Sequence, residues 1–186
     1  LNDLLIIDND ISIITTGGKL ALGTAYPIQI SGPTTAVNIT ENSLYSVSNG
    51  PNLGIYSQNF FGDTELFVSN NIINITGLAG QHEWALVAGI ESQDTYSEIF
   101  NNTIEVHSIA EVNEGDNIYG ISYRQSTDNE HYFNIKDNTM FSDGRTGVYI
   151  LGSEESNVTA APLCGAVQGE NRKLRDVCIF VQDGII

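Results

Sequence analysis

The chain has 186 residues, which is enough for a single domain with a sizeable hydrophobic core. Its hydrophobic fraction of 41% and charged fraction of 16% indicate a folded chain and exclude an intrinsically disordered one. The net charge of −16 repels phosphate backbones and anionic lipid headgroups, which makes nucleic acid and membrane surfaces poor candidates for partners. No apolar run approaches the roughly 18 residues that a transmembrane helix needs, so we expect no membrane insertion.

Five segments of the chain share one pattern, an asparagine flanked on both sides by alternating apolar residues. Counted from each asparagine, positions −5, −3, +2 and +4 are apolar in 17 of 20 cases. Alternation with a period of two predicts a short strand before and after each asparagine, each strand with one inward face. In chain order the segments are Leu4–Ile13, Val37–Leu44, Leu66–Ile75, Ile99–Val106 and Phe133–Met140, and their asparagines are Asn9, Asn42, Asn71, Asn102 and Asn138.

These asparagines are expected to sit at bends of the chain. The step from position −3 to position +2 is odd, so only a bend keeps both apolar sets facing one interior. Asparagine suits a bend, because it tolerates left-handed backbone angles and its amide can bond neighbouring backbone groups. Five asparagines at one phase would stack as a hydrogen-bonded ladder, which is a structural role and not a catalytic one.

A second recurrent element lies between the asparagine segments, a glycine followed by a β-branched residue. Successive asparagines are 33, 29, 31 and 36 residues apart, so each repeat supplies about three strands and turns of variable length. Such repetition predicts, for residues 1–150, an all-β parallel β-helix of about five coils. An antiparallel β-sandwich is the alternative, because its strands also alternate. The glycine elements are Gly54-Ile55, Gly89-Ile90, Gly120-Ile121 and Gly147-Val148.

The bend asparagine between apolar strands resembles the pectin-lyase-like right-handed β-helix superfamily over about residues 4–150. That superfamily includes polysaccharide lyases, phage tailspikes and autotransporter passenger domains. The repeats are also similar to those of chlamydial polymorphic outer-membrane proteins, which carry FxxN and GGA(I/L/V) motifs. Phe67-Val68-Ser69-Asn70 matches the first motif, whereas only the Gly-Ile half of the second motif recurs here. The resemblance implies a parallel β-helix at the cell surface or outside the cell.

The sequence offers little chemistry for a catalytic site. Pectin hydrolases of that superfamily carry Gly-His-Gly and Arg-Ile-Lys tripeptides, and neither tripeptide occurs here, so we expect no enzyme and no cofactor. Arg124 and Arg145 are isolated and more typical of salt bridges. The run His82-Glu83-Trp84 is suited to stacking on a sugar ring or to packing over a coil edge. Calcium is a weaker possibility, because Asp8-Asn9-Asp10 and Glu114-Gly115-Asp116-Asn117 offer oxygen ligands.

Residues 151–186 are expected to form an irregular cap or an inter-subunit strand segment. Cys164 and Cys178 are the only cysteines, which favours a disulfide in an oxidising compartment, with two reduced, buried thiols as the alternative. The ends of a β-helix carry unpaired strand edges that recruit other strands unless they are capped. The residues expected to take part in self-association are Leu4, Leu5, Ile6, Ile7, Arg172, Lys173, Arg175, Val177, Ile179, Phe180 and Val181.

The sequence therefore predicts an extracellular structural or adhesive module of the cell surface, whose partners are copies of itself. Association would use head-to-tail stacking or strand addition, and a contact that does not close would make a filament. The start at Leu1 instead of Met fits a removed signal peptide or a fragment. The alternative function is the binding or cleavage of surface glycans, in the manner of tailspikes and polysaccharide lyases. A self-contained cap is the alternative to self-association.

Overall fold

The computed structural model describes residues 3–15, 23–32, 36–59, 64–78, 86–108, 118–124, 132–142, 146–151, 157–164 and 177–182. Over these ranges the chain forms strands and no helix, so no helix that could cross a bilayer is present in them. Every strand pairing over the same ranges is parallel. The all-β prediction is therefore confirmed, and the antiparallel sandwich is wrong.

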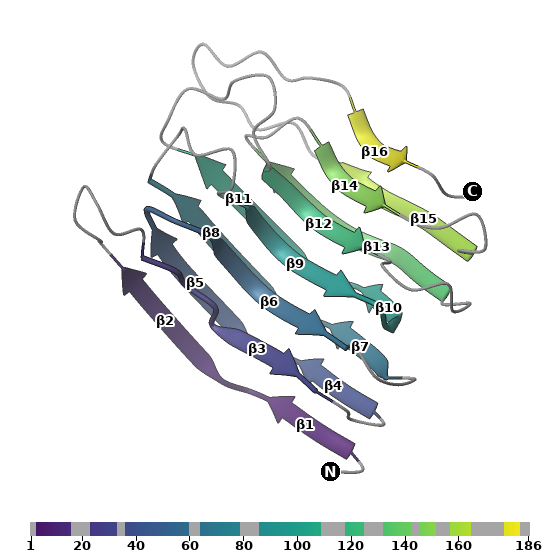
Figure 1. Cartoon of the computed structure of the whole chain (residues 1–186), viewed down its shortest axis with the longest axis horizontal. Coiled ribbons are helices and arrows are strands. Elements are labelled where there is room, and N and C mark those ends of the chain that lie inside the picture. Colours follow the sequence, from purple (N-terminus) through teal and green to yellow (C-terminus); the bar gives the residue numbers. More distant parts are fainter. Residues whose placement is uncertain are drawn as a thin grey trace.

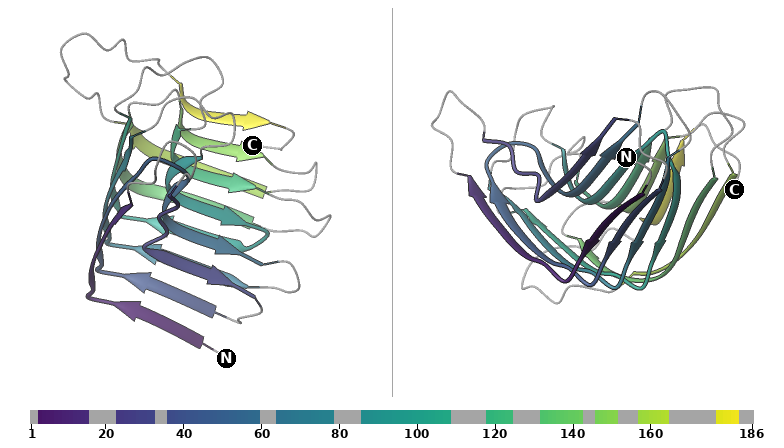
Figure 2. Two further views of the ribbon diagram at one scale, coloured as in Figure 1. Left: turned by 60° about the vertical axis from the view of Figure 1, so that its left-hand side comes forward. Right: turned by 90° about the horizontal axis from the view of Figure 1, so that it is seen from below.

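The strands stack in three columns, and each of the first four repeats of the chain adds one strand to each column (Figures 1 and 2). The first column contains β1 (Asp3–Ile7), β4 (Ala36–Thr40), β7 (Glu65–Ser69), β10 (Tyr96–Phe100), β13 (Tyr132–Ser142) and β15 (Asn157–Cys164). The second column contains β2 (Asp10–Thr15), β5 (Ser43–Ser48), β8 (Ile72–Gly77) and β11 (Thr103–Ser108), and it continues through the second half of β13 to the end of β15. The third column contains β3 (Ile28–Ser31), β6 (Asn52–Gln58), β9 (Val87–Gln93), β12 (Ile118–Arg124), β14 (Thr146–Leu151) and β16 (Val177–Gln182).

The first two columns form one ten-stranded sheet, and the third column forms a six-stranded sheet. We call the strands of one repeat, such as β1, β2 and β3, a layer. Residues of the asparagine pattern stay in register from layer to layer, so that Leu4 lies opposite Val37 and Val37 lies opposite Leu66. Inward side chains of both sheets meet in one hydrophobic core, which contains Ile39 from the first column and Ile55 from the third.

The serines that interrupt the apolar pattern also point into this interior. Ser46 and Ser97 are both fully buried. Ser46 Oγ donates to Asn52 Oδ1, and Ser97 Oγ shares hydrogen bonds of 2.7 Å with the hydroxyls of Ser92 and Thr95. Both of these serine hydroxyls therefore have a polar partner, which removes most of the cost of placing serine in an apolar row.

The left-handed bend lies one residue earlier than the sequence predicts. The ladder asparagines do not have positive φ, whereas the residue before each of them does, with φ between 54° and 59°. Four of these five residues are Asp or Asn, the side chains that tolerate this region best after glycine. Two adjacent residues thus have separate roles: the first forms the left-handed bend, and the asparagine after it forms the ladder. The left-handed residues are Asp8, Glu41, Asn70, Asn101 and Asp137.

Glu41 is the exception in this set, which gives a first testable prediction. It is exposed and holds φ at 59° without the local side-chain hydrogen bonds that Asp and Asn form. We expect Glu41→Asn to raise the free energy of unfolding by about 1 kcal/mol, because left-handed geometry costs ordinary L-residues about 1–2 kcal/mol. Urea denaturation followed by circular dichroism measures this. Glu65→Asn on the extended strand β7 is the control, and an equal gain there would contradict the explanation.

The glycine of the second repeated element lies where layers approach most closely. A Cβ atom on Gly54 would lie 2.6 Å from the carbonyl oxygen of Gly89 and 2.7 Å from Ile73 Cγ2. Both distances are far below a normal van der Waals contact, so no other residue fits without displacing the neighbouring layer. The glycine therefore allows the six-stranded sheet to pack against the second column, and the following β-branched residue, such as Ile55, fills the core.

The C-terminal segment is more regular than the sequence indicates. β15 pairs with β13, and β16 pairs with β14, so both strands continue the existing columns in parallel. The sequence hides this layer, because residues 157–164 carry no asparagine at the corner position. The role of residues 151–186 as a cap or as an inter-subunit segment stays a prediction.

Candidate functional site

The five asparagines of the sequence pattern lie one above the next and are joined by a continuous chain of hydrogen bonds. In each step the backbone N–H and Nδ2 of one asparagine both donate to Oδ1 of the asparagine in the following layer. From Asn42 to Asn71 the two distances are 2.9 and 3.0 Å. The steps from Asn9 to Asn42, from Asn71 to Asn102 and from Asn102 to Asn138 span 2.9–3.1 Å.

The amide groups of this ladder are fully engaged between its ends. Asn102 Nδ2, for example, also donates to Phe100 O and to Val68 O in the preceding layer, both at 3.0 Å. The same residue is 1% exposed, so no polar atom of it is left for a ligand. The ladder therefore satisfies backbone groups at a corner and is structural, which is the role that the sequence assigns to it.

Among the described residues no strand lies beyond the first layer, and this layer is incompletely buried. β1, β2 and β3 are edge strands of their sheets. Leu4 and Ile6 face the interior but are only partly buried, whereas Val37 and Ile39 directly opposite them are fully buried. On one side of the first layer, the core-facing side chains thus have no neighbouring layer to pack against. We call β1, β2 and β3, seen from this side, the open edge.

The outward face of the first layer also carries large exposed apolar side chains. Leu5 is 63% exposed, Ile7 is 44% exposed, and Ile14 on β2 is 65% exposed. Large exposed aliphatic side chains on an edge strand are a common feature of strand-addition sites and of aggregation-prone edges. The structure therefore brings the N-terminal residues predicted for self-association together at one exposed edge.

The other predicted residues are placed only in part. Val177, Ile179, Phe180 and Val181 lie on β16, an edge strand at the opposite end of the six-stranded sheet, and Cys164 and Cys178 lie on β15 and β16. Their side chains are not among those described, so the disulfide stays a prediction. Arg172, Lys173 and Arg175, the run His82-Glu83-Trp84 and the acidic run 114–117 lie outside the described residues.

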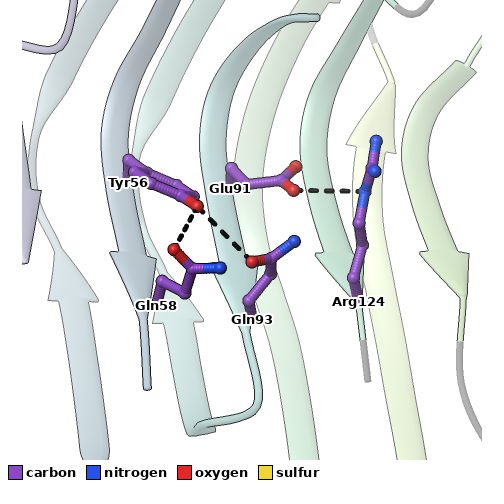
Figure 3. Close-up of polar contacts among 5 residues, drawn as sticks. All are labelled: Tyr56, Gln58, Glu91, Gln93 and Arg124. Atoms are coloured by element: carbon purple, nitrogen blue, oxygen red, sulfur yellow. Dashed lines mark hydrogen bonds and ion pairs between the residues drawn. The ribbon is translucent and has the colours of Figure 1, made fainter. Parts of the chain in front are cut away.

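A row of polar side chains crosses three strands of the six-stranded sheet on the face that points away from the core (Figure 3). Arg124 Nε lies 3.1 Å from Glu91 Oε1 in an ion pair. The Tyr56 hydroxyl donates to Gln58 Oε1 at 2.7 Å and lies 3.4 Å from Gln93 Oε1. We call Tyr56, Gln58, Glu91, Gln93 and Arg124 the polar row.

Glu91 is the most perturbed group of the polar row. It is 1% exposed, and Oε2 has no hydrogen-bond partner among the described residues. Burial raises the pKa of Glu91 to about 7, although the Arg124 charge and the nearby Ser122 hydroxyl both lower it. Ser122 Oγ nevertheless makes no well-formed hydrogen bond. Burial together with the Glu91 charge also raises the pKa of Tyr56 to about 12. Near neutral pH this carboxyl therefore changes its charge inside the protein.

A pH-dependent stability follows from this shift. A carboxyl whose pKa rises on folding stabilises the fold fully below its unfolded pKa near 4.5, and the contribution is lost as the pH rises towards 7. The shift corresponds to about 3 kcal/mol. We expect Glu91→Gln to remove this loss, so that the variant gains about 3 kcal/mol over the parent protein between pH 4.5 and pH 8. Chemical denaturation across this range measures the difference. Glu65→Gln, at an exposed carboxyl, is the control, and parallel profiles for Glu91→Gln and the parent protein would contradict the prediction.

No metal site emerges from the described part of the chain. Over those residues no group of three or more His, Cys, Asp or Glu side chains is placed to hold a metal ion. Asp8 and Asp10, two of the residues considered for calcium, are exposed on either side of Asn9. Calcium binding stays a prediction of the sequence alone.

Comparison of this chain with protein-family models, with curated proteins and with solved structures finds no significant match. The resemblance to the pectin-lyase-like superfamily therefore rests on the repeat pattern. The polar row and the open edge must be interpreted from their own geometry.

Sequence reasoning missed most of the polar row. It expected a salt bridge for Arg124 but identified neither Glu91 nor Tyr56. In the chain, Glu91 lies 33 positions before Arg124 and 35 positions after Tyr56. Only the register of β6, β9 and β12 brings these residues together. A detectable signal existed in the repeated Gln58 and Gln93, which occupy the same position relative to successive glycine elements.

Proposed function

We propose that this chain is a right-handed parallel β-helix of six coils and serves as an extracellular structural module that self-associates through its open edge. The incomplete burial of the first layer carries this proposal. Leu5, Ile7 and Ile14 are exposed there, and the backbone groups on the outer side of three strands have no strand partner among the described residues. Both features favour the addition of further strands.

The two ends of the stack support self-association, because they expose the same columns. β1 and β15 are the end strands of the first column, and β3 and β16 are the end strands of the third column. A second copy placed end to end would continue both sheets with parallel pairing throughout. Such a contact is heterologous and does not close, so its product is a filament.

Charge opposes this association and makes it depend on salt. The chain has a net charge of −16, and Asp3, Asp8 and Asp10 are exposed on the first layer. At physiological ionic strength, salt screens the repulsion between exposed charges that lie more than about 8 Å apart. Association is therefore expected to strengthen from low to physiological salt, in contrast to an assembly held by opposite charges.

Sedimentation velocity and electron microscopy of the purified chain test the proposal. We expect a mass that increases with concentration, and we expect Ile14→Lys to abolish the increase by placing a charge on the open edge. Ile72→Lys is the matched control, because Ile72 is 60% exposed on β8 within the stack. A chain that stays monomeric at all concentrations, or an equal effect of both substitutions, would overturn the proposal.

Glycan binding is a second candidate function, and the polar row favours it. Tyr26 and Tyr56 are partly exposed with ring centroids 5.6 Å apart, and the Tyr56 hydroxyl lies beside Gln58 and Gln93. Aromatic faces beside amide donors and acceptors suit sugar rings and their hydroxyls. Glu91 is too deeply buried to support a catalytic role. Binding to a glycan array that is lost in Tyr56→Ala would support this candidate, and unchanged binding in that variant would eliminate the polar row as the site.

A further inference from the structure

The asparagine ladder has a direction, and its first member is left incomplete. Each step runs from a donor in one layer to Oδ1 in the following layer, so Oδ1 of Asn42 accepts from both the backbone N–H and Nδ2 of Asn9 at 3.1 and 2.9 Å. No described residue donates to Oδ1 of Asn9, and Asn9 is exposed, whereas Asn42 is 1% exposed. The open edge therefore presents an acceptor that lacks two donors.

The apolar side chains of the first layer are incomplete in the same way. Leu4, Ile6 and Ile11 are partly buried and pack on the core from one side only. Their counterparts one layer further in have a layer on each side and are at most 1% exposed. The contact between two layers recurs through the stack, so a further layer is expected to make the same contact with the first layer.

The last layer of a second copy does not meet this requirement. In the pairing of β13 with β15, Lys136 lies opposite Ala161 and Thr139 lies opposite Leu163. One residue, Pro162, thus spans the corner where the preceding layer has Asp137 and Asn138. Proline has no backbone N–H and no side-chain amide, so Pro162 cannot donate to an asparagine of an adjoining layer.

We infer that the open edge prefers a polypeptide segment that carries an asparagine at the corner, in the pattern apolar-x-apolar-x-x-Asn-x-apolar, over the last layer of a second copy. The segment adds as a parallel layer before β1 and β2, and its corner asparagine donates to Oδ1 of Asn9. This inference rests on the strand addition at the open edge in the proposed function, and it names an occupant that the edge prefers to the end of a second copy. A coil of the kind that forms layers two to five carries this corner asparagine and apolar pattern, so it is the best match for the open edge.

A synthetic peptide with the sequence of residues 65–77 is a suitable probe, because it contains the complete pattern around Asn71. When this peptide is titrated into the full chain, we expect the backbone amides of residues 3–15 to become protected from hydrogen exchange. The same peptide with Asn71→Leu keeps its bulk but loses the donating amide, and we expect it to bind about tenfold more weakly. Against the chain variant Asn9→Leu the two peptides should bind alike, because the acceptor is gone.

The outcomes separate the inference from the proposed function. If the chain self-associates, the peptide with Asn71 should compete with that association and lower the mass seen in sedimentation. Self-association that this peptide does not affect would overturn the preference for a corner asparagine but leave the proposed function standing. Equal affinity of the two peptides for the parent chain would overturn the inference as well. A monomeric chain that binds neither peptide would remove both proposals.

Discussion

Replacing Asn71 with alanine is expected to lower the free energy of unfolding by about 4 kcal/mol. The amide of Asn71 accepts from the backbone N–H and Nδ2 of Asn42, and it donates to Ile39 O and Ser69 O. Asn71→Ala leaves the buried backbone N–H of Asn42 without its acceptor and removes the donor to Ile39 O and Ser69 O, and each unpaired buried polar group costs about 1–3 kcal/mol. Urea denaturation followed by far-ultraviolet circular dichroism gives the value.

Two further alanine variants make this a test of the ladder and not of asparagine in general. Asn70→Ala, at an exposed neighbour in the left-handed conformation, should cost about 1 kcal/mol through backbone strain. Asn9→Ala should also be mild, because Oδ1 of Asn9 accepts no hydrogen bond from the described residues. If Asn9→Ala or Asn70→Ala destabilises the protein as much as Asn71→Ala does, the ladder does not carry the stability assigned to it.

Gly89→Ala is expected to cost at least 3 kcal/mol, the upper end of the usual cost of overpacking. A Cβ atom there would clash with Ile104 Cγ2 and would lie 2.8 Å from the carbonyl oxygen of Gly120. The second contact is with backbone, which cannot move without shifting the next strand of the six-stranded sheet. Thermal and urea unfolding measure the loss, and a loss below 1 kcal/mol would show that the layers can separate easily.

Gly32→Ala is the matched control for this substitution. Nothing lies within 4 Å of a Cβ atom at Gly32, so its cost is that of a positive φ of 98° alone. The double variant Gly89→Ala with Ile104→Ala provides a second check. Removing the Ile104 side chain relieves one of the two clashes, so the combined loss should be smaller than the sum of the single losses.

The repeat and its register could be read from the sequence because their requirements are strict. An amide side chain carries two N–H donors and an oxygen that accepts twice, and the buried corner uses all of them, so Asn42, Asn71 and Asn102 recur at one phase of the apolar pattern. The glycines before Ile55 and Ile90 are equally constrained, because a Cβ atom at either position meets the adjoining layer. Stacked identical positions thus leave a periodic trace in the chain.

Other features left no such trace. The position of the left-handed residue depends on backbone geometry at the corner, and the sequence allowed either of two adjacent residues, such as Asn70 or Asn71. The ion pair of Glu91 with Arg124 depends on the register between β9 and β12, which lie a full repeat apart in the chain. The layer of β15 and β16 lacks the corner asparagine, so a search for asparagine could not find it.

The ladder also has an electrical consequence. Its side-chain amides are aligned, each N–H group pointing at the next carbonyl oxygen, so their dipoles add along the stack as peptide dipoles add along a helix. Hydrogen bonds in such a series polarise one another. The central amides gain most from this cooperation and the terminal amides gain least. Thermal fraying should therefore start at both ends of the stack and reach Asn71 last.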